Sequence, residues 1–223
     1  YYCNPIEVKY VLDKKDKINK EINNLIHNLS SDIFVNKLKT IFDINDISAD
    51  TTLHGSGIHY HPTNGRLNMH LDYEKHPILK DKQRRLNIIF YLNNEWSEEW
   101  NGATELWDEN MNNCIYKCYP EKNKAIIFET SEISWHGVPE IIKCPEGMYR
   151  KTLALYYISP LKSNPTKNKL GADEDGYRKK AVFVKRPFDK YDERMEKLYK
   201  IRPFRIITND DMKEIWPEWT INT

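Results

Sequence analysis

The chain has 223 residues, with 34 basic and 33 acidic side chains and a formal net charge of +1. This length suits one domain with a sizeable hydrophobic core. Charged residues make up 30% of the chain, and no apolar run reaches the roughly eighteen residues that a transmembrane helix needs, which excludes a membrane-spanning protein. An aromatic content of 12% excludes a mainly disordered chain, because disordered segments are poor in aromatic residues.

The four cysteines, Cys3, Cys114, Cys118 and Cys144, form no Cys-x-x-Cys pair and are too few for a disulfide scaffold. We therefore expect free thiols, a reducing compartment and a cytoplasmic location. Cys114 and Cys118 share a face of an expected strand, but two thiols do not complete a zinc site. Buried free thiols are the preferred interpretation.

The first forty residues are predicted to be helical. Over Leu12–Leu29, apolar residues recur at steps of three and four residues, as on one face of an amphipathic helix. Those residues are Ile18, Ile22, Leu25, Ile26 and Leu29. The run Ser30-Ser31-Asp32 then provides N-cap residues for a second short helix that continues through Leu38 and Ile41.

Beyond these helices the pattern changes to short runs rich in β-branched and aromatic residues, each bounded by Asn, Gly, Pro or charged residues. The runs are Gly57–Tyr60, Leu86–Leu92, Ala103–Trp107, Cys114–Tyr119, Ala125–Glu129 and Lys151–Ile158. Many short strands separated by turns favour a sandwich or barrel, with jelly rolls among the candidates. Tryptophans in and beside these runs are expected in the core, with a stacking surface for a substrate as the alternative. They are Trp96, Trp100, Trp107 and Trp135.

A C-terminal extension is expected after Pro160. Its first residues have the composition of a loop, and a helical pattern follows over Asp189–Ile201. The apolar residues of this pattern predict a stripe that docks on the core. They are Phe188, Tyr191, Met195, Leu198 and Tyr199. We therefore divide the chain into a barrel domain with N-terminal helices, residues 1–160, and an extension, residues 161–223, that packs on the same domain.

The extension is basic, because 14 basic and 7 acidic residues between Pro160 and Arg205 give a local charge of +7. Such a segment is either a nucleic-acid-binding surface or a solvated helix with ion pairs, and we favour the second.

A histidine and a carboxylate lie two residues apart at His70 and Asp72. On a strand, residues i and i+2 point to the same face, so both side chains can reach one metal ion. Taken alone, this spacing more often marks an ordinary surface or hydrogen-bonded histidine. A third residue, His136, lies 66 positions later, just past the strand predicted at Ala125–Glu129. Two histidines and one carboxylate form the facial triad of non-haem Fe(II) enzymes, which leaves three coordination positions open.

Arg150 opens an apolar strand and must find a partner once it is buried. A small dicarboxylate would satisfy its guanidinium with two parallel hydrogen bonds. His59 and His61 also have a metal-ligand spacing, and a second metal site there is the alternative to a single site at His70, Asp72 and His136.

From about His59 to Ile158 the sequence resembles the Fe(II)- and 2-oxoglutarate-dependent oxygenases, specifically their prolyl 4-hydroxylase-like branch. The residues that carry the resemblance are His70, Asp72, His136 and Arg150 in this order, Tyr60 ten residues before His70, the run Tyr91-Leu92-Asn93, and Thr152. The resemblance implies a double-stranded β-helix, or jelly roll: an all-β core with helical flanks, formed by N-terminal helices and the C-terminal extension.

The resemblance also implies roles for these residues. His70, Asp72 and His136 are expected to be the catalytic metal ligands. Arg150, Tyr91, Thr152 and Tyr60 are expected to bind the 2-oxoglutarate co-substrate. The cofactors implied are Fe(II), with 2-oxoglutarate as co-substrate, and ascorbate as a candidate reductant.

The expected reaction is hydroxylation of an unactivated C–H bond, with a protein or peptide prolyl residue as substrate and release of succinate and CO2. Asp72 favours hydroxylation over halogenation, because halogenation requires a non-ligand residue at that position. Tyr156 stands where the nucleic-acid demethylases of the superfamily typically have a second arginine, which argues against a nucleic-acid substrate. The alternatives are an oxygenase that acts on a small molecule or sugar, and a non-enzymatic jelly-roll binding module or zinc-bound protein.

Overall fold

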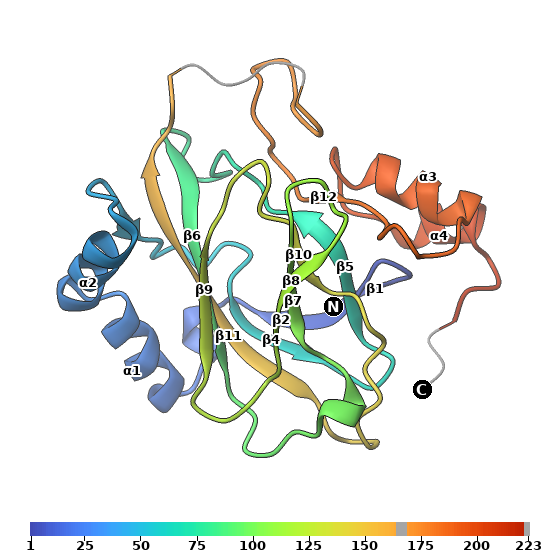
Figure 1. Ribbon diagram of the computed structural model, residues 1–223, viewed down its shortest axis with the longest axis horizontal. Helices are drawn as coiled ribbons and strands as arrows, with labels where there is room; N and C mark the ends of the chain where they lie inside the picture. The colour runs from blue at the N-terminus through green and yellow to red at the C-terminus, as the bar shows by residue number, and fades with distance from the viewer. Residues whose placement is uncertain (164–168, 221–223) are drawn as a thin grey trace.

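The computed structural model describes residues 1–163 and 169–220 of the chain. Antiparallel strands form a nearly closed barrel, in the order β8-β7-β10-β5-β2-β4-β11-β6-β9, and helices flank it on two sides (Figure 1). This architecture confirms the predicted all-β jelly roll with helical flanks. The strands are β1 (Tyr2–Asn4), β2 (Glu7–Leu12), β3 (Ser48–Ala49), β4 (Gly57–His61), β5 (Arg66–Leu71), β6 (Lys82–Tyr91), β7 (Thr104–Trp107), β8 (Cys114–Cys118), β9 (Ala125–Glu129), β10 (His136–Val138), β11 (Arg150–Pro160) and β12 (Val182–Phe183).

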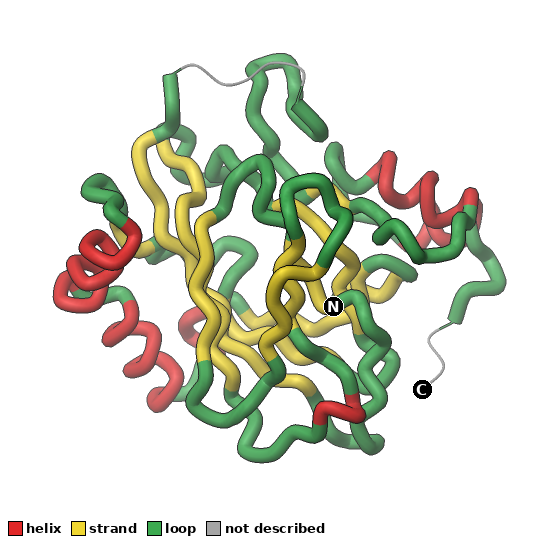
Figure 2. Tube along the Cα trace, in the orientation of Figure 1, coloured by secondary structure: helices red, strands yellow, loops and turns green. Residues whose placement is uncertain are grey.

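The strands form two sheets, which Figure 2 shows as two groups of yellow strands. One sheet contains β5, β7, β8, β10 and β12, and the other contains β3, β4, β6, β9 and β11. Strand β2 joins them, because Glu7 pairs with Leu67 of β5 while Tyr10 pairs with Tyr60 of β4. Each sheet therefore presents an inner face to the other.

The prediction that the first forty residues are helical is wrong for the first twelve, which form β1 and β2. The tertiary structure decides this, because β2 obtains its hydrogen bonds from β4 and β5, which are distant in sequence. Helix α1 (Lys20–Leu29) begins only after Asn19, whose side chain accepts a hydrogen bond from the Ile22 amide. Helix α2 (Asp32–Phe42) is capped by Ser31, as the sequence predicted.

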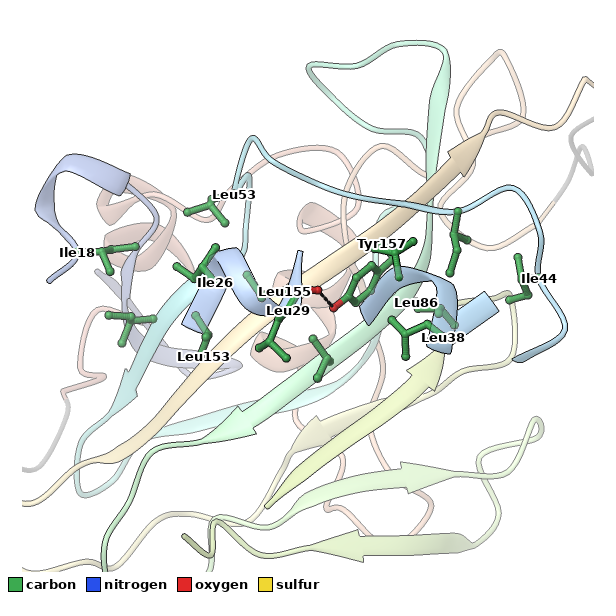
Figure 3. Close-up of a cluster of buried hydrophobic side chains, with 14 residues drawn as sticks. Ile18, Ile26, Leu29, Leu38, Ile44, Leu53, Leu86, Leu153, Leu155 and Tyr157 are labelled. Carbon is green, nitrogen blue, oxygen red and sulfur yellow. Dashed lines mark hydrogen bonds between the residues drawn. The ribbon is translucent and has the colours of Figure 1, made fainter. Parts of the chain in front are cut away.

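Helices α1 and α2 cover the outer face of the sheet that contains β4, β6 and β11 (Figure 3). Their apolar side chains pack on the outward residues of β6 and β11 in one buried cluster. A buried hydrogen bond crosses this cluster, from the Tyr157 hydroxyl to the Leu29 carbonyl at 2.8 Å. This bond satisfies one of the carbonyls that the end of α1 leaves without an intrahelical partner. The helices thus hold β11 from outside, and the inner face of the sheet stays available for a site.

On the opposite side of the barrel lie helices α3 (Glu193–Ile201) and α4 (Asn209–Ile215) (Figure 1). The helix predicted from Asp189 starts later, because Asp192 is its N-cap and accepts a hydrogen bond from the Arg194 amide. Leu198 and Tyr199 are buried in a cluster with Ile6 and Phe183. Phe188 and Tyr191 precede the helix and are 67% and 70% exposed, so the prediction that the whole stripe is buried is wrong for these two residues.

Ion pairs engage many of the basic residues after Pro160. Arg202 bonds to the buried Glu7 at 3.3 Å, Lys169 bonds to Glu74 and Glu132, and Lys179 pairs with nearby aspartates. The expected ion pairs are present, but Lys169 and Arg202 form theirs while largely buried and only Lys179 is solvated. The loop expected after Pro160 includes residues 164–168, which lie outside the described residues.

All four cysteines are free thiols, as predicted, and Cys118 and Cys144 are buried. Trp107 and Trp135 are buried in one hydrophobic cluster, and Trp96 and Trp100 pack beside another, which supports their assignment to the core. In the part of the chain that the structure describes, no helix has both the length and the hydrophobicity to cross a bilayer.

The burial of α3 leads to a stability prediction. Replacing Leu198 by Ala should lower the free energy of unfolding by about 2–5 kcal/mol, because a buried leucine leaves a cavity behind. Replacing the exposed Tyr191 by Ala should change it by no more than about 0.5 kcal/mol. Urea unfolding of both variants checks this, and equal destabilisation by the two changes would contradict the assigned packing.

Candidate active site

Two histidines and an aspartate meet on the inner face of the barrel. His70 lies near the end of β5, Asp72 follows that strand by one residue, and His136 opens β10 directly opposite His70. Asp72 Oδ1 lies 3.7 Å from His70 Nε2, and Asp72 Oδ2 lies 3.6 Å from His136 Nε2. Ligand atoms of the three residues all lie within 4.8 Å of one another, and within residues 1–163 and 169–220 this is the only such group of three or more metal-ligating side chains.

The backbone fixes the orientation of both imidazoles. His70 Nδ1 lies 2.9 Å from the Asn68 carbonyl, and His136 Nδ1 lies 2.9 Å from the Ser134 carbonyl. A carbonyl oxygen can only accept, so Nδ1 of each ring carries the proton and Nε2 has a free lone pair. Both Nε2 atoms face Asp72. Hydrogen bonds from Nδ1 to a backbone carbonyl are typical of histidines that bind a metal through Nε2.

The three side chains have the protonation states that a metal site requires. Burial lowers the pKa of His70 and His136 below the usual value, so both rings are neutral at pH 7. Burial alone would raise the pKa of Asp72, but the charge and hydrogen bond of Arg84 outweigh it and hold that pKa well below its usual range. A neutral histidine pair beside an ionised carboxylate fits a divalent cation, and two His with one carboxylate suit Fe(II).

Close strand pairing brings β10 against β5. A Cβ atom at Gly137 would lie 2.7 Å from the Leu67 carbonyl oxygen and 2.9 Å from that of Asn68. Any other residue at position 137 would therefore push the strands apart. Glycine next to His136 allows the ring of His136 to lie 4.3 Å from the ring of His70, centroid to centroid.

Arg150 lies in the same cavity and is only 2% exposed. Its Nε donates to the Gly102 carbonyl at 2.6 Å, and its Nη2 donates to the Thr104 hydroxyl at 2.8 Å. Among the described residues, no carboxylate pairs with this guanidinium, and burial lowers its pKa. A buried cation without an anion is costly, so the cavity favours an anionic ligand at this position.

Tyr91 and Thr152, which the sequence analysis expected to bind the co-substrate, lie near Arg150. The Tyr91 hydroxyl lies 2.8 Å from the Thr104 hydroxyl, which also accepts from Arg150, and Arg150 lies 5.4 Å from the centre of the Tyr91 ring. Thr152 is buried, lines the cavity and pairs with Tyr91 across the β6 and β11 strands. Thr152 can therefore contact a ligand that Arg150 binds, whereas Tyr91 does not line the cavity and adjoins the site through the Thr104 hydroxyl.

Tyr60 does not lie in the cavity. It packs from the outer face of β4 against the cluster under α1, and its ring contacts Tyr149. Side chains alternate along a strand, so the inner face of β4 belongs to His59 and His61. Both imidazoles are buried and line the cavity, and His61 pairs with Arg150 across the strands. Neither residue joins the metal-ligating group, so the second metal site considered from their spacing is not formed.

Arg84 is a site residue that the sequence analysis missed. Its Nη1 lies 2.7 Å from Asp72 Oδ2, and its side chain is 2% exposed. In the sequence it stands in the run Gln83-Arg84-Arg85, which looks like a charged strand end at the surface. The signal that identified Arg150, an arginine at the start of an apolar strand, was present here as well.

The buried imidazoles predict a loss of stability at acidic pH. Burial, together with the nearby cations Lys9 and Arg150, lowers the pKa of His59 and His61 well below the usual value. Below a pH of about 6.5 the unfolded chain binds protons that the folded protein does not, so the contribution of these groups to stability falls with pH. Replacing His61 by Gln should reduce the loss of unfolding free energy between pH values of about 7.5 and about 5.5 by about 1 kcal/mol. Urea unfolding at both pH values measures this, and an unchanged difference would contradict it.

Three solved structures illustrate what the chain is similar to. A Pseudomonas putida prolyl-4-hydroxylase has a TM-score of 0.48 and 13% identity, covering 70% of this chain and 73% of that chain. A viral collagen prolyl hydroxylase from Paramecium Bursaria Chlorella virus-1 has a TM-score of 0.47 and 13% identity, covering 71% and 80%. A Trichoplax adhaerens prolyl hydroxylase, solved with a hypoxia inducible factor peptide fragment, has a TM-score of 0.43 and 15% identity, covering 70% and 66%.

No curated protein matches the chain in sequence. The model of the 2OG-Fe(II) oxygenase superfamily matches residues 56–158, and this range contains His70, Asp72, His136 and Arg150. The geometry of these four residues agrees with the match: over residues 56–158 the chain is similar to the 2OG-Fe(II) oxygenase superfamily, a family that uses Fe(II) and 2-oxoglutarate.

Proposed function

We propose that this protein is an Fe(II)- and 2-oxoglutarate-dependent hydroxylase that acts on a prolyl residue of a protein or peptide and releases succinate and CO2. The observation that carries the proposal is the buried Arg150, which has no carboxylate partner among the described residues and shares a cavity with His70, Asp72 and His136. A metal-binding module without enzymatic activity would not require this second charge. A co-substrate with one chelating end and one distal carboxylate requires both the metal site and the buried cation.

Each residue has a role in this proposal. His70, Asp72 and His136 hold Fe(II) through two Nε2 atoms and one carboxylate oxygen. Arg150 binds the distal carboxylate of 2-oxoglutarate, with Thr152 and Tyr91 beside it. When bound, the iron and co-substrate would supply the oxidising chemistry for C–H hydroxylation, and the protein supplies binding and orientation. Ascorbate is proposed only as a reductant that keeps the iron in the Fe(II) state between turnovers.

The peptide substrate is proposed from the sequence resemblance. The run Tyr91-Leu92-Asn93 matches the prolyl hydroxylase pattern. Two of its residues, Tyr91 and Asn93, make contacts around Arg150. Tyr91 lies beside Arg150, and the Asn93 side chain bonds both to the Lys151 amide and to the Tyr149 carbonyl, at 2.8 Å each. The run therefore fixes the start of β11, where Arg150 enters the cavity. Incubation with a proline-rich peptide library, followed by a search for a 16 Da mass increase, tests this substrate against small molecules and sugars.

The metal assignment predicts the behaviour of an Asp72→Ala variant. It should form no succinate from 2-oxoglutarate with added Fe(II), because the metal loses its carboxylate ligand. Asp81→Ala is the matched control, since that side chain is exposed on the protein surface. Succinate formation is measured without a prime substrate, which also distinguishes an oxygenase from a binding module. Wild-type turnover in Asp72→Ala would rule out the assigned ligand set.

The role of Arg150 leads to a second prediction. Arg150→Ala should raise the KM for 2-oxoglutarate by about 100-fold or more, because breaking a buried charge pair costs about 3–5 kcal/mol. Arg150→Lys should be intermediate, since an amine keeps the charge and loses the planar pair of donors. The neighbouring Lys151 is exposed, so Lys151→Ala is the control that should leave KM unchanged. An unchanged KM in Arg150→Ala would assign the co-substrate carboxylate to another residue.

A further inference from the structure

Arg84, which the sequence analysis missed, makes a close contact with one of the proposed metal ligands. Its Nη1 lies 2.7 Å from Oδ2 of Asp72. The side-chain amide of Asn87 lies 3.4 Å from the same oxygen. Oδ1 of Asp72 has no such contact and faces His70 Nε2 at 3.7 Å. The two oxygens of one carboxylate therefore have different surroundings.

An irregularity in the strand pairing turns Arg84 toward Asp72. Tyr157 and Ile158 are consecutive in β11, but they pair with Leu86 and Arg84, which leaves Arg85 as an extra residue in β6. Leu86 points outward into the cluster beneath α2, and regular alternation would point Arg84 outward too. The bulge reverses this, so that Arg84 enters the barrel while Arg85 pairs with the half-exposed Glu129.

Two aromatic rings hold the guanidinium in place. The Arg84 Cζ atom lies 3.3 Å from the centre of the Tyr156 ring and 3.7 Å from the centre of the Tyr73 ring. Hydroxyl contacts fix both rings, because Tyr156 donates to the Gly55 carbonyl at 2.7 Å and Tyr73 donates to the His54 carbonyl at 3.2 Å. A guanidinium stacked on two anchored rings has little freedom to rotate, so it presents Nη1 to Asp72 in one direction.

We propose that Arg84 is a positioning residue that occupies Oδ2 of Asp72 and leaves Oδ1 alone to bind the metal. This inference rests on the proposed function. An aspartate can bind a metal through one oxygen or through both, and a second bound oxygen would fill a position that the facial triad leaves open. Arg84 disfavours this, because its strong, charge-assisted hydrogen bond withdraws electron density from Oδ2 and leaves Oδ1 as the better metal ligand. The residue thus sets the number of positions available to co-substrate and oxygen.

Co(II) binding tests this without any measurement of activity. The wild-type protein, Arg84→Gln, Arg84→Lys and Asp72→Ala are titrated with Co(II) alone, and the absorption spectrum in the visible range reports the coordination number. Arg84→Gln should bind Co(II) about 10–100-fold more weakly, the usual effect of losing a partner of a metal ligand, and its spectrum should change. Arg84→Lys should lose less Co(II) affinity, and its spectrum should lie between those of the wild type and Arg84→Gln. Arg85→Gln is the matched control and should behave as the wild type, because its side chain points away from Asp72.

Each outcome has a defined meaning. If circular dichroism shows that Arg84→Gln is unfolded, the Co(II) affinity and spectrum of Arg84→Lys test the role of Arg84. Folded variants with wild-type Co(II) affinity and spectrum would overturn the role of Arg84 while leaving the metal site intact. A wild-type protein that binds no Co(II), or an Asp72→Ala variant that binds it equally well, would instead overturn the metal site and with it this inference.

Discussion

The polar interior of this barrel depends on one buried carboxylate, that of Asp72. Asp72 follows β5 in one sheet, and its oxygens face His136 of β10 in the same sheet and Arg84 and Asn87 of β6 in the other. A largely buried carboxylate without partners is costly, so these contacts stabilise the fold as well as the candidate metal site. They also connect the two sheets at the point where the barrel interior is most polar. The loss of any one partner would leave the Asp72 charge less compensated inside the barrel.

The sheet that contains β4, β6 and β11 separates two environments. Its outer face is apolar and is covered by α1 and α2, where Tyr157 and Leu38 are almost fully buried. Its inner face bears His59, His61, Arg150 and Thr152, which line the cavity. Burying these polar side chains on the inner face costs free energy. Apolar packing on the outer face of the same strands offsets that cost. Stability and function are thus placed on opposite faces of one sheet.

The C-terminal segment contributes to the same site although the family match ends at residue 158. Phe183 of β12 pairs with His70 along β5, and its ring stacks on the His70 imidazole at 4.9 Å between centroids. Arg202, at the end of α3, pairs with Glu7 of β2, whose side chain lines the cavity. Segments on both sides of the matched range therefore form part of the cavity wall. This supports our proposal that the extension packs on the barrel domain, as far as the structure describes it.

The sequence by itself identified four residues of the candidate site. His70, Asp72, His136 and Arg150 were identifiable because metal binding and carboxylate binding demand particular side chains at strand spacings, and local chemistry carries that information. The helices at Lys20–Leu29 and Asp32–Phe42 were predictable for the same reason, from periodicity and caps. Only the tertiary structure decided which face each strand turns inward. Tyr60 lies outside because β4 pairs with β11 in one register, and Arg84 lies inside because a single extra residue in β6 reverses the alternation. Register and bulges arise from pairing between distant strands, so no local pattern in the sequence could determine them.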